Sequence, residues 1–502
     1  MTLISFSSGC NLSYFNLFKV PILLFQILKT HNMKIEQIYT SCIAHAAYYL
    51  ESNGEAAIFD PLRETQPYID KANKDNAVIK YVFETHFHAD FVSGHLDLAK
   101  KTGANIVYGP TAKPQFDAIV AEDNQIFRIG KVQIKVLHTP GHTLESTTYL
   151  IIDEQGKEHG LITGDTLFIG DVGRPDLAQH VISDLTEDFL ATHLFHSLRN
   201  KIMPLNDDLI IYPNHGAGSA CGKKMSKETT DTLGNQKKVN YALRPDMTLE
   251  EFKKELLTGL TAPPQYFPQN VLMNIKGYES LDIVLERAKK PLNVIEFEFL
   301  ANETKALVLD TRNANDFAKT FIPNSINIGI DGSFAMWVGE LIHDLKQPIL
   351  LVTEEGREEE VMIRLSRVGY DNTIGYLKGG IKAWMDAGKE TESVERISAE
   401  WLAKELTNES VIIDVRKVSE FNAEHLVNAI NIPLNVLNEN LASFPKNKAF
   451  VIHCAGGYRS MIAASMLKQR GYDNFVDVEG GFTELAKTAI PKTEYVCPTT
   501  LL

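Results

Sequence analysis

The chain has 502 residues, of which 44% are hydrophobic and 23% are charged, so it is long enough for about three globular domains and is not a disordered chain. Its 50 Lys and Arg residues are outnumbered by 64 Asp and Glu residues, and the net charge of -14 disfavours both a nucleic-acid binder and attachment to an anionic membrane surface. The five cysteines are odd in number and widely spaced, which predicts a reducing, cytoplasmic location rather than a disulfide framework.

The first 32 residues differ from the rest of the chain. Their apolar run is interrupted by Lys19, Pro21 and Gln26, and a membrane span needs about 20 apolar residues. No Lys or Arg precedes Lys19, and no small-residue cleavage site follows, so the run is also a poor secretory signal. We expect residues 1–32 to be an extension that is disordered or that results from an upstream start codon, and Met33 to open the first domain.

Residues 33–285 alternate short apolar runs with Gly, Pro and Asp, which predicts a strand-rich first domain. The expected buried strands are residues 46–50, 56–60, 79–84, 132–138, 148–153, 160–165 and 208–213. Residues 93–104 have apolar side chains at helical spacing and a Gly at position 103, which predicts a helix that ends there. A Pro-rich segment at 261–268 indicates that the end of this domain is near.

The C-terminal part contains an internal repeat. Equivalent residues lie 104 positions apart: Asp310 and Asp414, Arg312 and Arg416, Phe317 and Phe421, Asn327 and Asn431. Both copies read as alternating strands and helices, which predicts two small α/β domains at 290–390 and 395–495. A charged segment at 390–401 joins them.

Polar side chains directly follow four of the predicted strands of the first domain. They are His86, His88 and Asp90 after one strand, and His142, Asp165 and His215 after three others. Strand ends in a sheet sandwich converge on one rim, and His together with Asp at such a rim suits a first-row transition metal. The sequence therefore predicts a metal site in this domain.

The pattern H-x-H-x-D followed by His, Asp and His resembles the metallo-β-lactamase superfamily over residues 33–280. This resemblance implies an αββα sandwich. In the two-metal hydrolases of the superfamily, a further His follows the first motif and binds the second metal. Phe91 stands at that position and offers no lone pair, so we expect a centre with one metal. Such a centre is similar to that of the persulfide dioxygenases, which hold one iron(II) with two His and one carboxylate.

The resemblance also implies roles for individual residues. The implied ligands of one Fe(2+) per chain are His86, His142 and Asp165. The residues implied to support them through hydrogen bonds are His88, Asp90 and His215. A three-His ligand set that includes His88, and Zn(2+) in place of iron, are alternatives. We expect Arg174, in a Gly-containing loop after Asp165, to contact an anionic substrate, although an Arg at the solvated surface is equally compatible with the sequence.

The last repeat contains a strand, a short loop from Cys454 to Arg459, and a helix. Gly456 and Gly457 allow the loop to curl so that backbone N–H groups and the helix N-terminus surround the thiol, which stabilises a thiolate or persulfide anion. Arg459 is expected to bind sulfite or an incoming anion. The unit resembles rhodanese domains, which implies that Cys454 is the nucleophile of sulfur transfer; an unreactive buried cysteine is the alternative.

The first repeat lacks this thiol. Alignment on the end of the strand places Glu354 at the position of Cys454, and a carboxylate cannot accept a sulfur atom. We expect 290–390 to be an inactive rhodanese-like domain that acts as a spacer and docking surface. The predicted fold class is therefore an αββα metallo-β-lactamase sandwich followed by two rhodanese-like α/β domains.

The two predicted chemistries share an intermediate. A persulfide dioxygenase uses O2 to convert a low-molecular-weight thiol persulfide to sulfite, and a rhodanese can pass a sulfane sulfur to sulfite, which gives thiosulfate. The sequence thus predicts a cytoplasmic enzyme of sulfur metabolism that couples both steps. It predicts no nucleic-acid or membrane partner, and it is compatible with a homodimer or a larger oligomer. The alternatives are a zinc thioester hydrolase of the glyoxalase II type and a sulfur-binding module with sulfurtransferase activity only.

Overall fold

The computed structural model describes residues 33–180, 185–260 and 262–496. The expectation for residues 1–32 lies outside this part of the chain. Within the described ranges, no helix combines the length and the apolar character that crossing a membrane requires.

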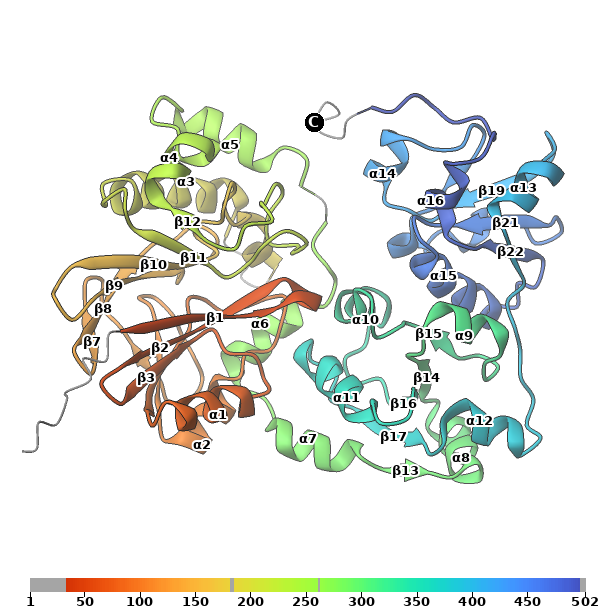
Figure 1. The fold of residues 1–502 in the computed structure, drawn as a ribbon, viewed down its shortest axis with the longest axis horizontal. Helices are drawn as coiled ribbons and strands as arrows, with labels where there is room; N and C mark the ends of the chain where they lie inside the picture. The colour runs from red at the N-terminus through yellow and green to blue at the C-terminus, as the bar shows by residue number, and fades with distance from the viewer. Residues whose placement is uncertain (1–32, 181–184, 261, 497–502) are drawn as a thin grey trace, which may run out of the picture. The chain divides into compact units, whose positions relative to one another are not determined.

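The first domain is a sandwich of two six-stranded sheets with helices on both outer faces (Figure 1). The first sheet has the order β1 (Lys34–Thr40), β2 (His45–Ser52), β3 (Glu55–Phe59), β4 (Val78–Phe83), β5 (Asn105–Tyr108) and β6 (Ile119–Val120). The second has the order β12 (Asp231–Thr232), β11 (Ile210–Pro213), β10 (Glu158–Gly164), β9 (Thr147–Ile152), β8 (Val132–His138) and β7 (Ile126–Ile129). All seven predicted strands are confirmed.

Apolar side chains fill the space between the two sheets and beneath the outer helices. Phe59 and Phe83 of the first sheet and Tyr149 and Ile162 of the second share one buried cluster, so the sheets pack face to face. The helices of this domain are α1 (Gln66–Lys74), α2 (His95–Thr102), α3 (Glu187–Ser197), α4 (Leu233–Val239), α5 (Leu249–Leu257), α6 (Phe267–Lys276) and α7 (Leu281–Ala288). Helix α2 ends at Gly103, whose left-handed backbone (φ 76°) closes it as predicted.

Two parallel strand pairs bring the candidate site loops to one rim. β3 runs parallel to β4, and β10 runs parallel to β11. Their carboxyl ends therefore lie at the same edge of each sheet, and the loops that follow them can meet.

The two C-terminal domains each contain a five-stranded parallel sheet with the same strand order. The first is β13 (Pro291–Leu292), β17 (Thr373–Leu377), β16 (Ile349–Val352), β14 (Leu307–Asp310) and β15 (Ile326–Asn327). The second is β18 (Arg396–Ile397), β22 (Phe475–Val478), β21 (Phe450–His453), β19 (Val411–Asp414) and β20 (Ile430–Asn431). Their helices are α8 (Val294–Thr304), α9 (Ala314–Lys319), α10 (Phe334–Leu341), α11 (Glu358–Arg367) and α12 (Gly380–Asp386), then α13 (Ala399–Glu405), α14 (Val418–Ala423), α15 (Tyr458–Gln469) and α16 (Gly481–Leu485).

The residues that define the repeat make the same contacts in both copies. Asp310 accepts a hydrogen bond from Arg312 at 2.6 Å, and Asp414 accepts one from Arg416 at the same distance. The Asn327 amide donates to two backbone carbonyls next to its Asp–Arg pair, and so does the equivalent Asn in the second copy. The repeat therefore preserves a buried polar network that fixes the loop after the central strand.

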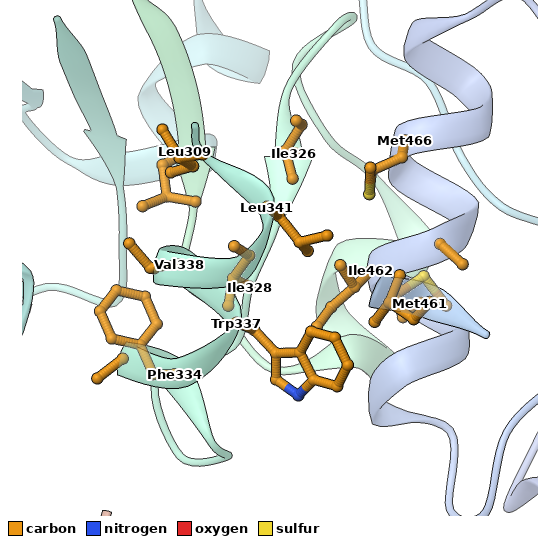
Figure 2. Close-up of a cluster of buried hydrophobic side chains, with 14 of the residues drawn as sticks. Leu309, Ile326, Ile328, Phe334, Trp337, Val338, Leu341, Met461, Ile462 and Met466 are labelled. Atoms are coloured by element: carbon orange, nitrogen blue, oxygen red, sulfur yellow. The ribbon is translucent and has the colours of Figure 1, made fainter. Parts of the chain in front are cut away.

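A continuous apolar interface joins the two C-terminal domains. Trp337 and Leu341 of α10 pack toward Met461 and Ile462 of α15, as Figure 2 shows. At its edge, the Ser465 hydroxyl accepts a hydrogen bond from a backbone amide of β15 at 3.0 Å. This burial holds the two domains in a fixed relative position.

The first domain is tied to the middle domain by a buried arginine. The guanidinium of Arg63 is fully buried and donates to both carboxylate oxygens of Asp371, at 2.6 and 2.9 Å, and to the carbonyl of Ser366 at 2.9 Å. The backbone amide of Val92, next to the predicted metal motif, donates to the carbonyl of Arg367 at 2.7 Å. The middle domain thus packs directly behind the motif loop.

Candidate functional site

The structure brings the three predicted metal ligands together. His86 follows β4, His142 follows β8 and Asp165 follows β10, and one potential ligand atom of each lies within 4.8 Å of the others. Asp165 Oδ2 is 3.5 Å from His142 Nε2 and 3.9 Å from His86 Nε2. All three side chains are buried.

Hydrogen bonds orient both imidazoles toward Asp165. His142 Nδ1 donates to the carbonyl oxygen of Arg174 at 2.8 Å, which leaves the lone pair on Nε2. His86 Nδ1 lies 2.9 Å from the Thr85 hydroxyl. Burial, and then the neighbouring imidazoles of His88 and His142, hold the pKa of His86 well below its usual value, so this ring is neutral and can ligate a metal.

The state of the Asp165 carboxylate indicates that these residues fit a metal ion. Neither of its oxygens has a hydrogen-bond partner among the described residues, although both are buried. A buried carboxylate without a partner is strongly unfavourable, and a cation bound by two neutral imidazoles would remove that cost. The donor set of two nitrogens and one carboxylate suits iron(II) or zinc(II).

The three predicted supporting residues form a second cluster beside the first. One potential ligand atom from each of His88, Asp90 and His215 also lies within 4.8 Å of the others. His215 Nδ1 donates to the carbonyl of Ala44, and its Nε2 lies 3.6 Å from Asp165 Oδ1. Burial raises the pKa of Asp90, whose carboxylate lies 3.5 Å from His215 Nε2. His215 therefore links the two clusters.

A buried acidic network, which the sequence analysis did not identify, holds His88. His88 Nε2 lies 2.9 Å from Asp60 and 3.5 Å from Glu84. Burial disfavours its charged form, but these carboxylates outweigh that effect and raise the pKa of His88 well above its usual value. Asp60 has a left-handed backbone (φ 48°) directly after β3, and this strain aims its carboxylate at the network. The other ring nitrogen, Nδ1, is buried without a hydrogen-bond partner among the described residues, so this geometry is compatible both with a supporting role for His88 and with a place in the ligand set.

Phe91 fills the place next to this network. Its fully buried ring stacks on His88 with 4.3 Å between centroids, and it lies at the same distance from the ring of His45. The residue directly after Asp90 thus has an apolar ring that packs against two imidazoles, and this ring offers no ligand atom to a second ion.

Cys221 is a further side chain at the site. Its sulfur lies within 4.8 Å of atoms of Asp165 and His215. Burial, followed by the charges of Asp90 and Asp165, raises the pKa of this thiol well above its usual range. A small cavity of about 130 Å³ adjoins Asp90, and Ser333 and Met336 of the middle domain contribute to its wall. Neither feature follows a recognisable strand or motif in the sequence.

The side chain of Arg174 is bound within the protein. Its guanidinium donates to both oxygens of Asp176, at 2.7 and 2.5 Å, and its side chain is buried. Its backbone carbonyl is the group that orients His142. Arg174 thus contributes to the ligand geometry through its main chain, and substrate contact by its side chain stays a prediction.

The Cys454 thiol, in the loop after β21, is buried and accepts one backbone hydrogen bond. The backbone amide of Gly457 donates to Cys454 Sγ at 3.1 Å, and Gly457 has a left-handed backbone (φ 94°) directly before α15. Arg459 pairs with both oxygens of Glu420 at 2.6 and 2.8 Å. Burial opposes ionisation of Glu420, but Arg459 outweighs it and holds the pKa of this carboxyl below its usual value.

The equivalent loop of the middle domain corrects one residue assignment. Asp310 pairs with Val352 just as Asp414 pairs with His453, so Thr353, not Glu354, takes the position of Cys454. The alignment was one residue out because strand β16 ends at Val352, and apolar residues alone do not mark that end. A threonine hydroxyl cannot form a persulfide, so the absence of a thiol at this position still holds.

Sequence comparison agrees with this arrangement of domains. The profile of the metallo-beta-lactamase superfamily matches residues 41–215, which include every candidate metal ligand. The mitochondrial persulfide dioxygenase ETHE1 of Homo sapiens is 30% identical over 228 residues, a match that covers 44% of this chain and 79% of that protein. The chain belongs to the metallo-β-lactamase superfamily. Domains of this superfamily bind metal, and this member continues with two segments, 295–387 and 398–488, that match the rhodanese-like domain.

Other relatives from the superfamily are described with different activities. A probable hydroxyacylglutathione hydrolase of Schizosaccharomyces pombe is 31% identical over 174 residues, or 34% of this chain, and the chain spans 62% of that relative's length. A crystal structure described as a metallo-beta-lactamase from Staphylococcus aureus is 31% identical, with a TM-score of 0.61, and the match covers 69% of this chain and 99% of that one. These matches support the fold class, an αββα metallo-β-lactamase sandwich followed by two rhodanese-like α/β domains, and an enzyme built from them.

Proposed function

We propose that this protein is a two-centre enzyme of sulfur metabolism: an iron-dependent dioxygenase that converts a thiol persulfide to sulfite, and a sulfurtransferase that forms or uses thiosulfate through Cys454. The observation that carries this proposal is the buried cluster of His86, His142 and Asp165, with its unpaired carboxylate, on the same chain as a buried thiol that accepts a backbone hydrogen bond. The human relative named as a persulfide dioxygenase supports it.

In the metal domain, the chain's own residues would hold and shape the centre. His86, His142 and Asp165 would be the ligands of one Fe(2+), and iron(II) would supply the redox chemistry with O2 that protein side chains lack. The Arg174 carbonyl keeps the lone pair of His142 on the ligand nitrogen. Asp90 and His215 are placed to accept or donate a proton beside the centre. Phe91 keeps this side of the pocket apolar and free of a further ligand.

In the last domain, the thiolate of Cys454 would attack the sulfane sulfur of a persulfide or thiosulfate. The donor's S–S bond breaks, the thiol or sulfite leaves, and Cys454 becomes a persulfide that passes its sulfur to the next acceptor. The Gly457 amide and the positive end of α15 stabilise the negative sulfur before and after transfer. Sulfite from the first centre is a suitable acceptor, so thiosulfate would be the shared product.

A zinc thioester hydrolase is the second candidate, because the S. pombe relative is described as a probable hydroxyacylglutathione hydrolase. That chemistry usually employs two metals, and Phe91 occupies the position of a second-metal ligand. A sulfurtransferase whose metal domain only binds sulfur compounds is a third possibility.

Oxygen uptake distinguishes these functions. Protein loaded with iron(II) is offered the persulfides of glutathione and coenzyme A in an oxygen electrode, and sulfite is measured in the same sample. Thiosulfate is measured as well, because the sulfurtransferase would convert part of the sulfite to thiosulfate. We expect O2 consumption matched by an equal total amount of sulfite and thiosulfate. Hydrolysis of a glutathione thioester without O2 uptake would instead establish the hydrolase, and neither reaction would leave only the sulfurtransferase.

A further inference from the structure

A large cleft lies between the two rhodanese-like domains, directly at the loop that holds Cys454. Its volume is about 830 Å³. One wall is the loop at Gly456–Tyr458 together with Gly480, and the opposite wall is helix α9 of the domain without a thiol, with Asn313, Asn315 and Lys319. Arg396, the first residue of strand β18, also contributes to this cleft.

The floor of the cleft is the part of the loop that covers the thiol. A Cβ atom built on Gly456 would meet no other atom within 4 Å, so the backbone there faces open space. The neighbouring Gly457 donates its amide hydrogen to Cys454 Sγ on the other side. Cys454 is itself buried and does not line the cleft, so the cleft adjoins the thiol through this loop, opposite helix α9.

The size of the cleft exceeds what a small inorganic donor needs. Pockets for organic ligands of drug size typically measure about 300–1,000 Å³. Thiosulfate is far smaller than 830 Å³ and would leave most of this volume to water. The volume suits a sulfur donor whose sulfane sulfur is attached to a larger organic body.

The chemistry of the walls indicates a polar body with charged groups. The Lys319 ammonium is exposed at the cleft, with a surface ion pair to Asp316 at 2.9 Å. The guanidinium of Arg396 is held by Asp477 at 2.9 Å and by Asn315 at 2.5 Å, and lies 3.4 Å from the position of a Cβ on Gly457. The carboxylate of Glu479 adds a negative group. The walls thus present side-chain amides and charges of both signs. These groups complement the peptide bonds, amino group and carboxylates of a thiol built from amino acids.

We propose that helix α9 selects the sulfur donor of Cys454 by binding the polar, carboxylate-bearing body of a low-molecular-weight thiol persulfide. The thiolate of Cys454 forms a bond to the outer sulfur of R–S–SH, the donor's S–S bond breaks, and R–S⁻ leaves and takes a proton from water. No net oxidation or reduction occurs. This inference rests on the proposed sulfurtransferase function, and it gives the rhodanese-like domain without a thiol a direct role in specificity.

The test compares donors of different size and charge. Sulfur transfer to cyanide is measured with glutathione persulfide, with the persulfide of uncharged mercaptoethanol, and with thiosulfate. Lys319→Glu reverses a charge on the wall, and Ala314→Phe, on the same helix, places a larger side chain in the cleft. The matched control is Lys382→Glu, which breaks an exposed ion pair of the same kind on α12, outside the cleft.

We expect Lys319→Glu and Ala314→Phe to raise the KM for glutathione persulfide about tenfold, with kcat nearly unchanged. The KM values for thiosulfate and for mercaptoethanol persulfide should change less than about twofold in Lys319→Glu, because neither donor places a carboxylate on α9. Equal changes in KM for all donors, or no change in KM for glutathione persulfide, would overturn the inference. Either result would leave the proposed sulfurtransferase function standing. A wild-type protein that transfers sulfur from none of these donors would overturn the inference together with the proposed function.

Discussion

We expect Cys454→Ser to lower the rate of sulfur transfer by about a thousandfold or more, because a serine hydroxyl cannot form a persulfide. The change is conservative in shape, and the Gly457 amide can still donate to the hydroxyl, so the fold is retained. The assay is cyanide-dependent consumption of thiosulfate, with circular dichroism as the check on folding.

Two further cysteines serve as controls for this experiment. Cys42 and Cys221 both lie in the metal domain, and neither belongs to the loop of the last domain. Cys42→Ser and Cys221→Ser should keep the thiosulfate-dependent activity within about twofold of the wild type. Residual transfer in Cys454→Ser above the uncatalysed rate would show that another group accepts the sulfur.

Asp165→Asn should weaken metal binding by at least about a hundredfold and abolish persulfide-dependent O2 uptake. The amide keeps the size of the side chain but removes the charge that a divalent ion needs, and replacement of residues that only support metal ligands already costs 10–100-fold. Metal affinity by competition with a chromogenic chelator measures the effect. Asp208→Asn, at an exposed position of the same domain, is the matched control.

The same variant gives a second readout that does not depend on activity. In metal-free protein, Asp165 is a buried carboxylate without a partner among the residues described, and its replacement by a neutral amide relieves that cost. Metal-free Asp165→Asn should therefore unfold at a temperature no lower than metal-free wild type. A clear loss of thermal stability would mean that Asp165 acts as a structural hydrogen-bond acceptor instead. Thiosulfate-dependent transfer through Cys454 should be unaffected.

Much of the architecture could be predicted from apolar patterns. The strands before His86, Asp165 and His215 are short, buried runs with a clear end, and their carboxyl ends had to share a rim once paired. The repeat was readable because Asp310 and its counterpart Asp414 perform the same buried hydrogen-bonding role. These features depend on local sequence or on strong repetition.

The environment of the site was not predictable in the same way. Asp60 and Glu84 reach His88 from two different strand ends, and neither belongs to a motif. The direction of a loop side chain depends on which partner tertiary folding brings to it, so the pairing of Arg174 with Asp176 could not be read from the sequence. The alignment of Glu354, instead of Thr353, with Cys454 has a simpler cause. An error of one residue in the length of a strand shifts every residue assignment in the loop that follows it.

With Phe91 at the position of a second-metal ligand, we propose that this superfamily member binds a single metal ion per chain. The most direct test is the metal content of protein purified anaerobically from cells supplied with both iron and zinc, measured by mass spectrometry against protein concentration. We expect one iron per chain in the wild type, and a second ion when Phe91→His places an imidazole directly after Asp90. Two metal ions per chain in the wild type would contradict it.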